Sequence, residues 1–277
     1  MWLLTLQCIL VASDLGERSL LAVRTAARLA HLADARLHLL HVAADAEPTG
    51  GSATLREQAR SVAGIAPVAT ARVVVGSPAA AIVEQAMGLG ADVIVFGPHR
   101  PDREGGGRLG STAVDVIQTA PCPCLIAAGD LHLPLDRVIV PTDTSEAARG
   151  AVAVGLSWAS ALRPPGGEAE LVVLHVLTGE AGPGAEARLR SDVDRAREMA
   201  GGAARVRVRE VLAEAPEPAA EILRRAGDPG TDLLVMGTHG HTGESDRLGS
   251  VSSAVARAAL KPLLLVPPDV RRARADA

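Results

Sequence analysis

Short apolar runs alternate with longer amphipathic segments along the first half of the chain. Five of the runs have the length and continuity of parallel strands buried on both faces. They occupy residues 9–11, 37–42, 68–75, 93–96 and 125–127. The segments between them predict helices at 18–33, 55–62, 79–87 and 111–119. The pattern therefore predicts five strands in alternation with four helices.

The second half repeats this order. Its apolar runs predict strands at 138–140, 171–176, 206–212, 233–236 and 263–266. The segments between them predict helices at 147–162, 186–199, 218–226 and 250–260. Thr144 or Ser145 is expected to cap the first of these helices, and Pro218 opens the third.

Alternation of this kind predicts an α/β fold with two tandem domains. Each is expected to be a doubly wound, Rossmann-like parallel sheet with helices on both faces. The first domain is expected over residues 1–130 and the second over 136–268, with a linker at 129–136. Residues 269–277 are expected to form a basic tail.

Matched residues show that the halves are an internal repeat. Asp14 matches Asp143 at an offset of 129 residues (143 − 14), and His41 matches His175 at 134 (175 − 41). The segment 92–97 matches 232–237 at 140 (232 − 92). The offset between matched residues changes slowly along the chain, which indicates small insertions in loops. A repeat length near 140 residues indicates two domains instead of short solenoid repeats.

One glycine-rich phrase occurs in both halves with one defect in each. In the second half, Met236-Gly237-Thr238-His239-Gly240 is followed after eight residues by Gly249-Ser250. In the first half, Phe96-Gly97-Pro98-His99-Arg100 is followed after nine residues by Gly110-Ser111. Small residues at a strand end and at a helix start let the backbone approach phosphate oxygens, so the phrase predicts nucleotide binding.

The positions of the marked residues agree with this prediction. Asp14 and Asp143 follow the first strand of each half, and Val42 and Val176 close the second. Ligands of open parallel sheets bind at the carboxyl ends of the strands, where the strand order reverses. An aspartate there can accept hydrogen bonds from ribose or base, although Asp143 taken alone could equally cap the next helix.

The second half combines Val-Pro-Thr-Asp-x-Ser-Glu, His-Val and Gly-x-x-Gly before Gly-Ser, and in this it resembles the universal stress protein family. The resemblance covers nearly the whole chain, once in each half. It implies two adenine-nucleotide-binding domains that pack against each other as a pseudo-dimer, and a homodimer of the whole chain is a further alternative. Carried onto the second half, the implied contacts to base and ribose are Pro141, Thr142, Asp143 and Val176. The implied ribose-phosphate contacts are Met236, Gly237, His239, Gly240, Gly249, Ser250 and Val251.

The first half departs further from the family pattern. Ala12-Ser13 replaces Pro-Thr, and Arg100 replaces the second glycine. A side chain at Arg100 would crowd the backbone approach if the position needs a positive φ, or its guanidinium could neutralise phosphate charge. The weaker second site would comprise Asp14, Val42, Gly97, Arg100, Gly110 and Ser111.

Composition excludes several other functions. The net charge of −4 gives no general attraction to nucleic acid or membrane, and one Phe, two Trp and no Tyr leave few stacking platforms. The chain lacks the nucleotide-phosphate loop with lysine, the hydrolase serine elbow and the zinc-protease helix motif. Three Cys and no long apolar run predict a cytoplasmic protein without disulfides or membrane spans.

Several residues that could take part in catalysis or metal binding also have a structural interpretation. His41 and His175 close apolar strands without a nucleophile or metal ligand nearby in the sequence, which favours a structural role. His239 lies inside the glycine phrase, where a backbone contact to phosphate is favoured over acid–base chemistry. Cys122 and Cys124 lead into a buried strand, which favours packing over redox or metal chemistry.

The sequence thus predicts a cytoplasmic stress-response protein that binds ATP or another adenine nucleotide, with or without Mg²⁺, chiefly in its second domain. It would act as a sensor or regulator through a protein partner that the sequence does not identify. A scaffold that binds no nucleotide is one alternative. A weak ATPase is another, for which Asp143 is the evident metal-binding candidate.

Overall fold

We describe the protein from a computed structural model, which covers residues 6–43, 50–98, 109–201, 205–240 and 248–268. The chain divides into two compact units, with the boundary between Asp130 and Leu131. Each unit is described by itself, and the pseudo-dimer stays a prediction. The basic tail at 269–277 lies outside the described residues.

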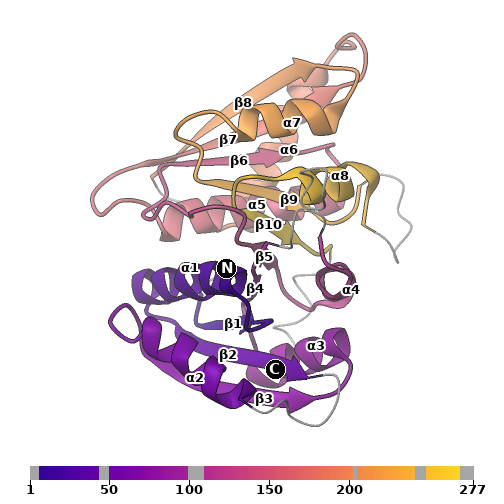
Figure 1. The fold of residues 1–277 in the computed structure, drawn as a ribbon. Helices are drawn as coiled ribbons and strands as arrows, with labels where there is room; N and C mark the ends of the chain where they lie inside the picture. The colour runs from indigo at the N-terminus through magenta and orange to yellow at the C-terminus, as the bar shows by residue number, and fades with distance from the viewer. Residues whose placement is uncertain (1–5, 44–49, 99–108, 202–204, 241–247, 269–277) are drawn as a thin grey trace. The chain divides into compact units, whose positions relative to one another are not determined.

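The first unit has the predicted alternation of strands and helices (Figure 1). Its strands are β1 (Cys8–Ala12), β2 (Arg36–Ala43), β3 (Val68–Val75), β4 (Val93–Phe96) and β5 (Cys124–Ile126). Its helices are α1 (Glu17–Ala33), α2 (Gly51–Ser61), α3 (Pro78–Leu89) and α4 (Ser111–Thr119). Helix α2 begins four residues before its predicted start at 55, because its first turn carries no apolar signal.

The second unit repeats the arrangement. Its strands are β6 (Arg137–Pro141), β7 (Ala169–Leu177), β8 (Val206–Glu214), β9 (Leu233–Gly237) and β10 (Leu263–Val266). Its helices are α5 (Glu146–Ala161), α6 (Ala185–Met199), α7 (Pro218–Ala226) and α8 (Ser250–Ala258). Ser145 caps α5 by accepting a hydrogen bond from the Ala148 amide. It is one of the two residues predicted to cap this helix.

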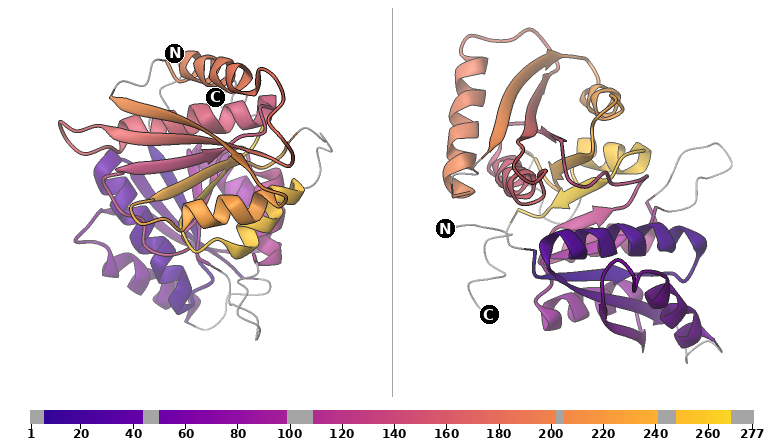
Figure 2. Two further views of the ribbon diagram at one scale, coloured as in Figure 1. Left: turned by 90° about the horizontal axis from the view of Figure 1, so that it is seen from above. Right: turned by 90° about the vertical axis from the view of Figure 1, so that its left-hand side faces the viewer.

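The strands of each unit pair in parallel. Their order is β3-β2-β1-β4-β5 in the first unit and β10-β9-β6-β7-β8 in the second. In the second unit α5 and α6 cover one face of the sheet, and α7 and α8 cover the other (Figure 2). This is the doubly wound fold predicted from the alternation, and its strand order reverses between β1 and β4 and between β6 and β9.

A buried aspartate closes the amino end of the central strands in both units. The Oδ2 atom of Asp92 accepts hydrogen bonds from two backbone amides at the start of β1, at 2.6 and 3.0 Å. The Oδ2 atom of Asp232 accepts two at the start of β6, at 2.8 and 2.9 Å. Both aspartates are buried, so their repetition has a structural reason: each satisfies two amides that enter the core.

The polar groups between the first two helices differ between the units. In the first unit, Gln58 accepts a hydrogen bond from Ser13 Oγ at 2.7 Å and donates one to Ser19 Oγ at 3.2 Å. In the second, Arg149 Nε donates to Asp192 Oδ1 at 2.6 Å. Gln58 and Asp192 are equivalent residues, at an offset of 134 (192 − 58). One domain therefore has a neutral network where the other has an ion pair.

The three cysteines are buried in the first unit. Burial raises the pKa of the Cys122 thiol to about 12, and it also raises the pKa values of Cys8 and Cys124. Protonated, enclosed thiols behave as small apolar side chains, which agrees with the packing role favoured for Cys122 and Cys124.

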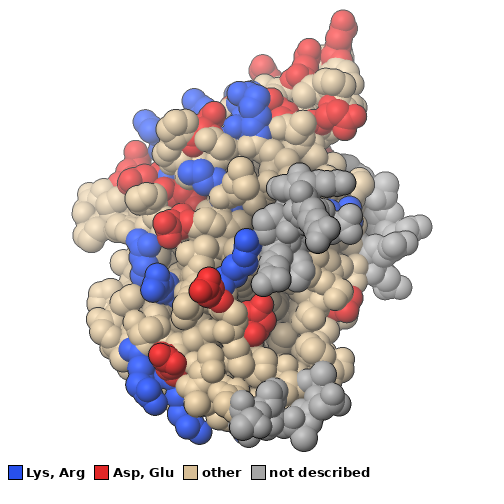
Figure 3. Space-filling model, in the orientation of Figure 1, with Lys and Arg blue, Asp and Glu red and all other residues tan. Residues whose placement is uncertain are grey.

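The described surface mixes charges of both signs. On the face drawn in Figure 3, basic and acidic side chains lie among one another instead of forming one large area of a single sign. None of the described helices has both the length and the apolar character of a membrane-spanning segment.

Candidate functional site

The turn after the first strand has the same construction in both units. The hydroxyl of Ser13 accepts the Leu15 amide, and the hydroxyl of Thr142 accepts the Thr144 amide, both at 3.0 Å. Leu15 and Thr144 share a left-handed φ of 64°. The next carboxylate, Asp14 or Asp143, accepts the amide two residues ahead, at 2.9 and 3.0 Å respectively. Each aspartate is thereby fixed at the carboxyl end of the central strand.

A histidine on the second strand secures this turn. Nδ1 of His41 contacts the carbonyl oxygen of Ser13 at 2.8 Å, and Nδ1 of His175 contacts that of Thr142 at 2.7 Å. A carbonyl can only accept, so Nδ1 carries the proton in both rings. The two histidines therefore hold the turn that presents the aspartate, which is a structural role of the kind favoured from the sequence.

The first glycine of each phrase packs against a helix. A Cβ atom on Gly97 would lie 2.9 Å from the carbonyl oxygen of Arg18 in α1. A Cβ atom on Gly237 would lie 3.4 Å from the carbonyl oxygen of Ala147 in α5. The absence of a side chain at Gly97 thus lets the end of β4 lie against the first turn of α1, a reason that the sequence had not suggested, whereas the approach at Gly237 is looser.

The second glycine of the complete phrase lies against the site aspartate. A Cβ atom on Gly240 would lie only 2.6 Å from Asp143 Oδ2, while Oδ1 of the same carboxylate is held by the Ser145 amide. Gly240 has no left-handed φ. At Gly240 the restriction on a side chain therefore comes from the proximity of Asp143 and not from φ, whereas the crowding considered for Arg100 stays a prediction. Arg100 itself lies outside the described residues.

Hydrogen bonds connect the glycine phrase to the start of α8. The Gly249 amide donates to the Thr238 carbonyl at 2.8 Å, and the Thr238 hydroxyl contacts Nδ1 of His239 at 2.8 Å. Nε2 of His239 is buried, and it has no partner among the residues that the structure describes. The two ends of the loop are thus joined, while the loop between them, at 241–247, lies outside the described residues.

Helices α4 and α8 begin beside these loops without a side-chain cap. Gly110 and Gly249 occupy the cap positions and supply no side-chain acceptor. The first amides of each helix consequently keep donors that its own turns cannot satisfy, and they lie at the positive end of the helix dipole. Ser250 is exposed and Val251 half-buried at this helix start, which suits an anion.

The remaining residues predicted for the second domain lie on the strands. Pro141 is the last residue of β6 and Met236 lies within β9, and both are buried. Val176 lies near the end of β7 and is half-buried. Pro141 and Met236 therefore belong to the core, whereas Asp143, Gly240 and Ser250 are at least partly exposed.

The first unit has a cavity of about 320 Å³ at the corresponding place. Five of the six residues predicted for the weaker site line it, namely Asp14, Val42, Gly97, Gly110 and Ser111. Its apolar walls include Pro78 and Ile82 of α3, which the prediction had missed. Their identities recur as Pro218 and Ile222, at an offset of 140 (218 − 78), so the internal repeat could have identified them.

Comparisons with known proteins agree with the duplicated fold. The sequence profile of the universal stress protein family matches residues 6–128 and 134–267. A Pseudomonas aeruginosa structure described as a universal stress protein is 20% identical, with 96% of this chain and 95% of that chain covered and a TM-score of 0.68. One from Archaeoglobus fulgidus is 20% identical, with 94% and 98% covered and a TM-score of 0.71.

A shorter universal stress protein from Archaeoglobus fulgidus was crystallised in complex with dAMP. It is 24% identical, covers 43% of this chain with 96% of its own, and has a TM-score of 0.37. No curated protein matches the chain.

Proposed function

The chain belongs to the universal stress protein family as two domains in tandem, and we propose that it binds an adenine nucleotide, chiefly in the second domain. Binding would report the energy or stress state of the cell by changing how the protein engages a partner. ATP is the first candidate ligand, with ADP and AMP as alternatives. The role is that of a sensor that holds its ligand without rapid turnover.

The contact between Asp143 and Gly240 is the observation that carries this proposal. It brings together the turn after β6 and the phrase after β9, on the two central strands where the order reverses. A carboxylate there accepts hydrogen bonds from ribose hydroxyls. The missing side chain at Gly240 lets the backbone of the phrase lie against Asp143, so that a ligand held by the carboxylate would also meet the phrase.

The start of α8 would hold the phosphates. Gly249 is tied to Thr238, so the helix start is held at the end of β9. The amides of Ser250 and Val251 belong to the first helical turn, where backbone donors and the dipole favour negative charge. This arrangement needs no lysine, which agrees with a sequence that lacks the lysine-containing phosphate loop.

The cavity of the first domain favours a second, weaker site for the same ligand class. Its volume of about 320 Å³ is at the lower end of the range for small-molecule sites. Asp14 and the start of α4 offer the same acceptor and donors as their counterparts in the second domain. We expect the second domain to be occupied first, because it has glycine at the position of Arg100.

Titration calorimetry and native mass spectrometry of the full chain with ATP, ADP and AMP test the proposal. The decisive variant is Gly240→Arg, which copies the first domain into the second and drives a side chain into Asp143. Affinity should fall by at least about tenfold. The control is Gly64→Arg, at an exposed site where a Cβ meets nothing within 4 Å.

A matched pair of substitutions assigns the domain. Asp143→Ala should weaken the tighter binding event, whereas Asp14→Ala should affect only the weaker one. Loss of the tighter event in Asp14→Ala would move the principal site to the first domain. A folded protein that binds none of the three nucleotides at about 1 mM would support the scaffold alternative instead.

A further inference from the structure

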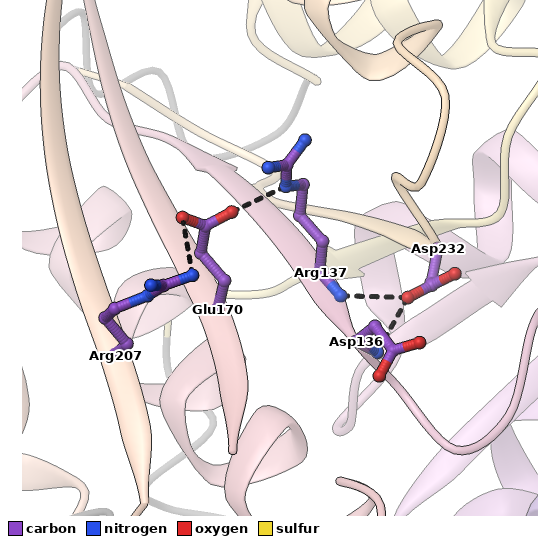
Figure 4. Close-up of polar contacts among 5 residues, drawn as sticks. All are labelled: Asp136, Arg137, Glu170, Arg207 and Asp232. Atoms are coloured by element: carbon purple, nitrogen blue, oxygen red, sulfur yellow. Dashed lines mark hydrogen bonds and ion pairs between the residues drawn. The ribbon is translucent and has the colours of Figure 1, made fainter. Parts of the chain in front are cut away.

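The second domain has a cavity at the end of its sheet opposite to the proposed nucleotide site. It has a volume of about 330 Å³ and lies at the amino ends of β6, β7 and β8, whereas the nucleotide site lies at the carboxyl ends. Arg137, Glu170 and Arg207 occupy paired positions on these three strands and form a charged row across the cavity (Figure 4). We propose that this cavity binds a small zwitterion, specifically a free amino acid.

Glu170 lies within ion-pair distance of both guanidinium groups of the row. Its Oε2 lies 2.6 Å from Arg137 Nε, and its Oε1 lies 3.5 Å from a terminal nitrogen of Arg207. The Glu170 side chain is only 11% exposed, whereas those of Arg137 and Arg207 are 35% and 68% exposed. A nearly buried carboxylate thus holds Arg137 closely and Arg207 more loosely, and both arginines keep accessible outer parts.

Both arginines keep donors for a ligand. The terminal nitrogens of Arg137 point away from Glu170 (Figure 4), and they make no hydrogen bond within the described part of the chain. Two parallel N–H groups of a guanidinium match the two oxygens of a carboxylate. The row therefore offers a place for a carboxylate group beside Arg137 of β6. Arg207 of β8 would add a second positive charge.

Carboxylates on the same cavity select against a simple anion. Asp136 and Glu168 line it, both are exposed, and neither forms an ion pair with another described residue. They would repel a second negative charge but attract an ammonium group. An amino acid presents both signs within a few bonds, and a cavity of this volume accommodates it.

The shared fold does not explain the row. In the first domain Cys8 occupies the position of Arg137, and Arg36 occupies that of Glu170, in the same strand register. The aspartate that closes the amino end of the strands is nevertheless present in both domains. Since the first domain forms the same scaffold without the row, the fold does not require it, and recognition of a ligand accounts for its presence.

Calorimetric titration of the full chain with each standard amino acid, up to about 10 mM, tests the proposal. Succinate, inorganic phosphate and putrescine serve as probes that carry a single sign of charge. At least one amino acid should bind, and each of these probes should bind at least about tenfold more weakly. Arg207→Gln and Asp136→Asn should each weaken amino-acid binding by about tenfold, since each removes one charged partner.

Arg209→Gln is the matched control, because Arg209 is an exposed arginine on the same strand outside the cavity. It should leave amino-acid binding unchanged, and all three variants should keep the ATP affinity of the wild type. The proposal is overturned if no amino acid binds, if Arg207→Gln and Asp136→Asn bind as the wild type does, or if a single-sign probe binds as tightly as the best amino acid. Failure here would leave the nucleotide proposal intact, because that site lies at the other edge of the sheet.

Discussion

The two domains share the side chains that hydrogen-bond to backbone groups at the strand ends, and they differ in the side chains around them. Both have the hydroxyl and aspartate turn after the first strand, the histidine that secures it, and the aspartate that closes the amino end. The polar links between the first helices and the residues at the amino edge are different. Duplication thus preserved what satisfies buried backbone groups, while the groups available to ligands diverged.

The glycines divide in the same way. Gly97 and Gly237 both lie beside the first turn of a helix, and the approach is closer at Gly97. Gly240 instead leaves room beside Asp143. Of these glycines, Gly240 is the one that differs in the first domain, where the sequence has Arg100.

The largest effect is expected from the ion pair that only the second domain has. Arg149→Leu introduces the residue found at the equivalent Leu20 and leaves the buried Asp192 without its cation. The second domain should lose about 3 kcal/mol of stability. The double variant Arg149→Leu/Asp192→Gln, which copies the first domain, should recover most of this loss.

Urea unfolding followed through tryptophan fluorescence in a Trp2→Phe background, which leaves Trp158 of α5 as the reporter, measures the second domain. A single Arg149→Leu variant as stable as the wild type would show that the difference between the domains has no energetic weight.

The aspartates at the amino end should show how far the domains are equivalent. Asp92→Ala and Asp232→Ala each remove the acceptor of two backbone amides. We expect each domain to lose about 2 kcal/mol, with similar losses in the two. Hydrogen exchange of the amides at the start of β1 and β6 measures both, and Asp130→Ala, at an exposed position, is the control. Strongly unequal losses would contradict a shared structural role.

Glycine packing should separate the domains by a smaller amount. Gly97→Ala places a methyl group 2.9 Å from a backbone carbonyl, whereas in Gly237→Ala the nearest backbone atom is 3.3 Å away. The first substitution should cost about 2 kcal/mol and the second less than about 1 kcal/mol. Thermal unfolding of both variants, with Gly64→Ala as the control, tests this order. The reverse order would mean that α1 moves away from the sheet more readily than α5.

Acid sensitivity should be the most subtle difference. Burial and then the charge of Arg36 lower the pKa of His38, whose counterpart in the second domain is Val172. The unfolded chain therefore takes up a proton first, and the first domain should lose stability as the pH falls below 6.5 towards the lowered pKa. His38→Val should remove this part of the pH dependence.

Hydrogen exchange of the first domain, measured in a pH series for the wild type and for His38→Val, makes the comparison. Identical pH profiles would show that protonation of His38 is not coupled to folding.

Most of the fold could be predicted from the sequence because strands and helices leave different hydrophobic periods. The start of α2 was placed late, since Gly51 and Ser52 carry no apolar signal. The candidate site residues were predicted from the repeated phrase, but the packing of Gly97 and Gly237 beside a helix was not. A glycine that lies against a helix backbone and a glycine that lies against a carboxylate look the same in the sequence.

The sequence by itself determined two parallel α/β domains, their order of elements and the segments that meet at the carboxyl edge. Periodicity and the internal repeat encode these features locally. Only the tertiary structure placed Gly240 against Asp143, enclosed the first-domain cavity and aligned Arg137, Glu170 and Arg207. Those relations depend on strand register and helix packing between residues that are far apart in the chain, and no local pattern records them.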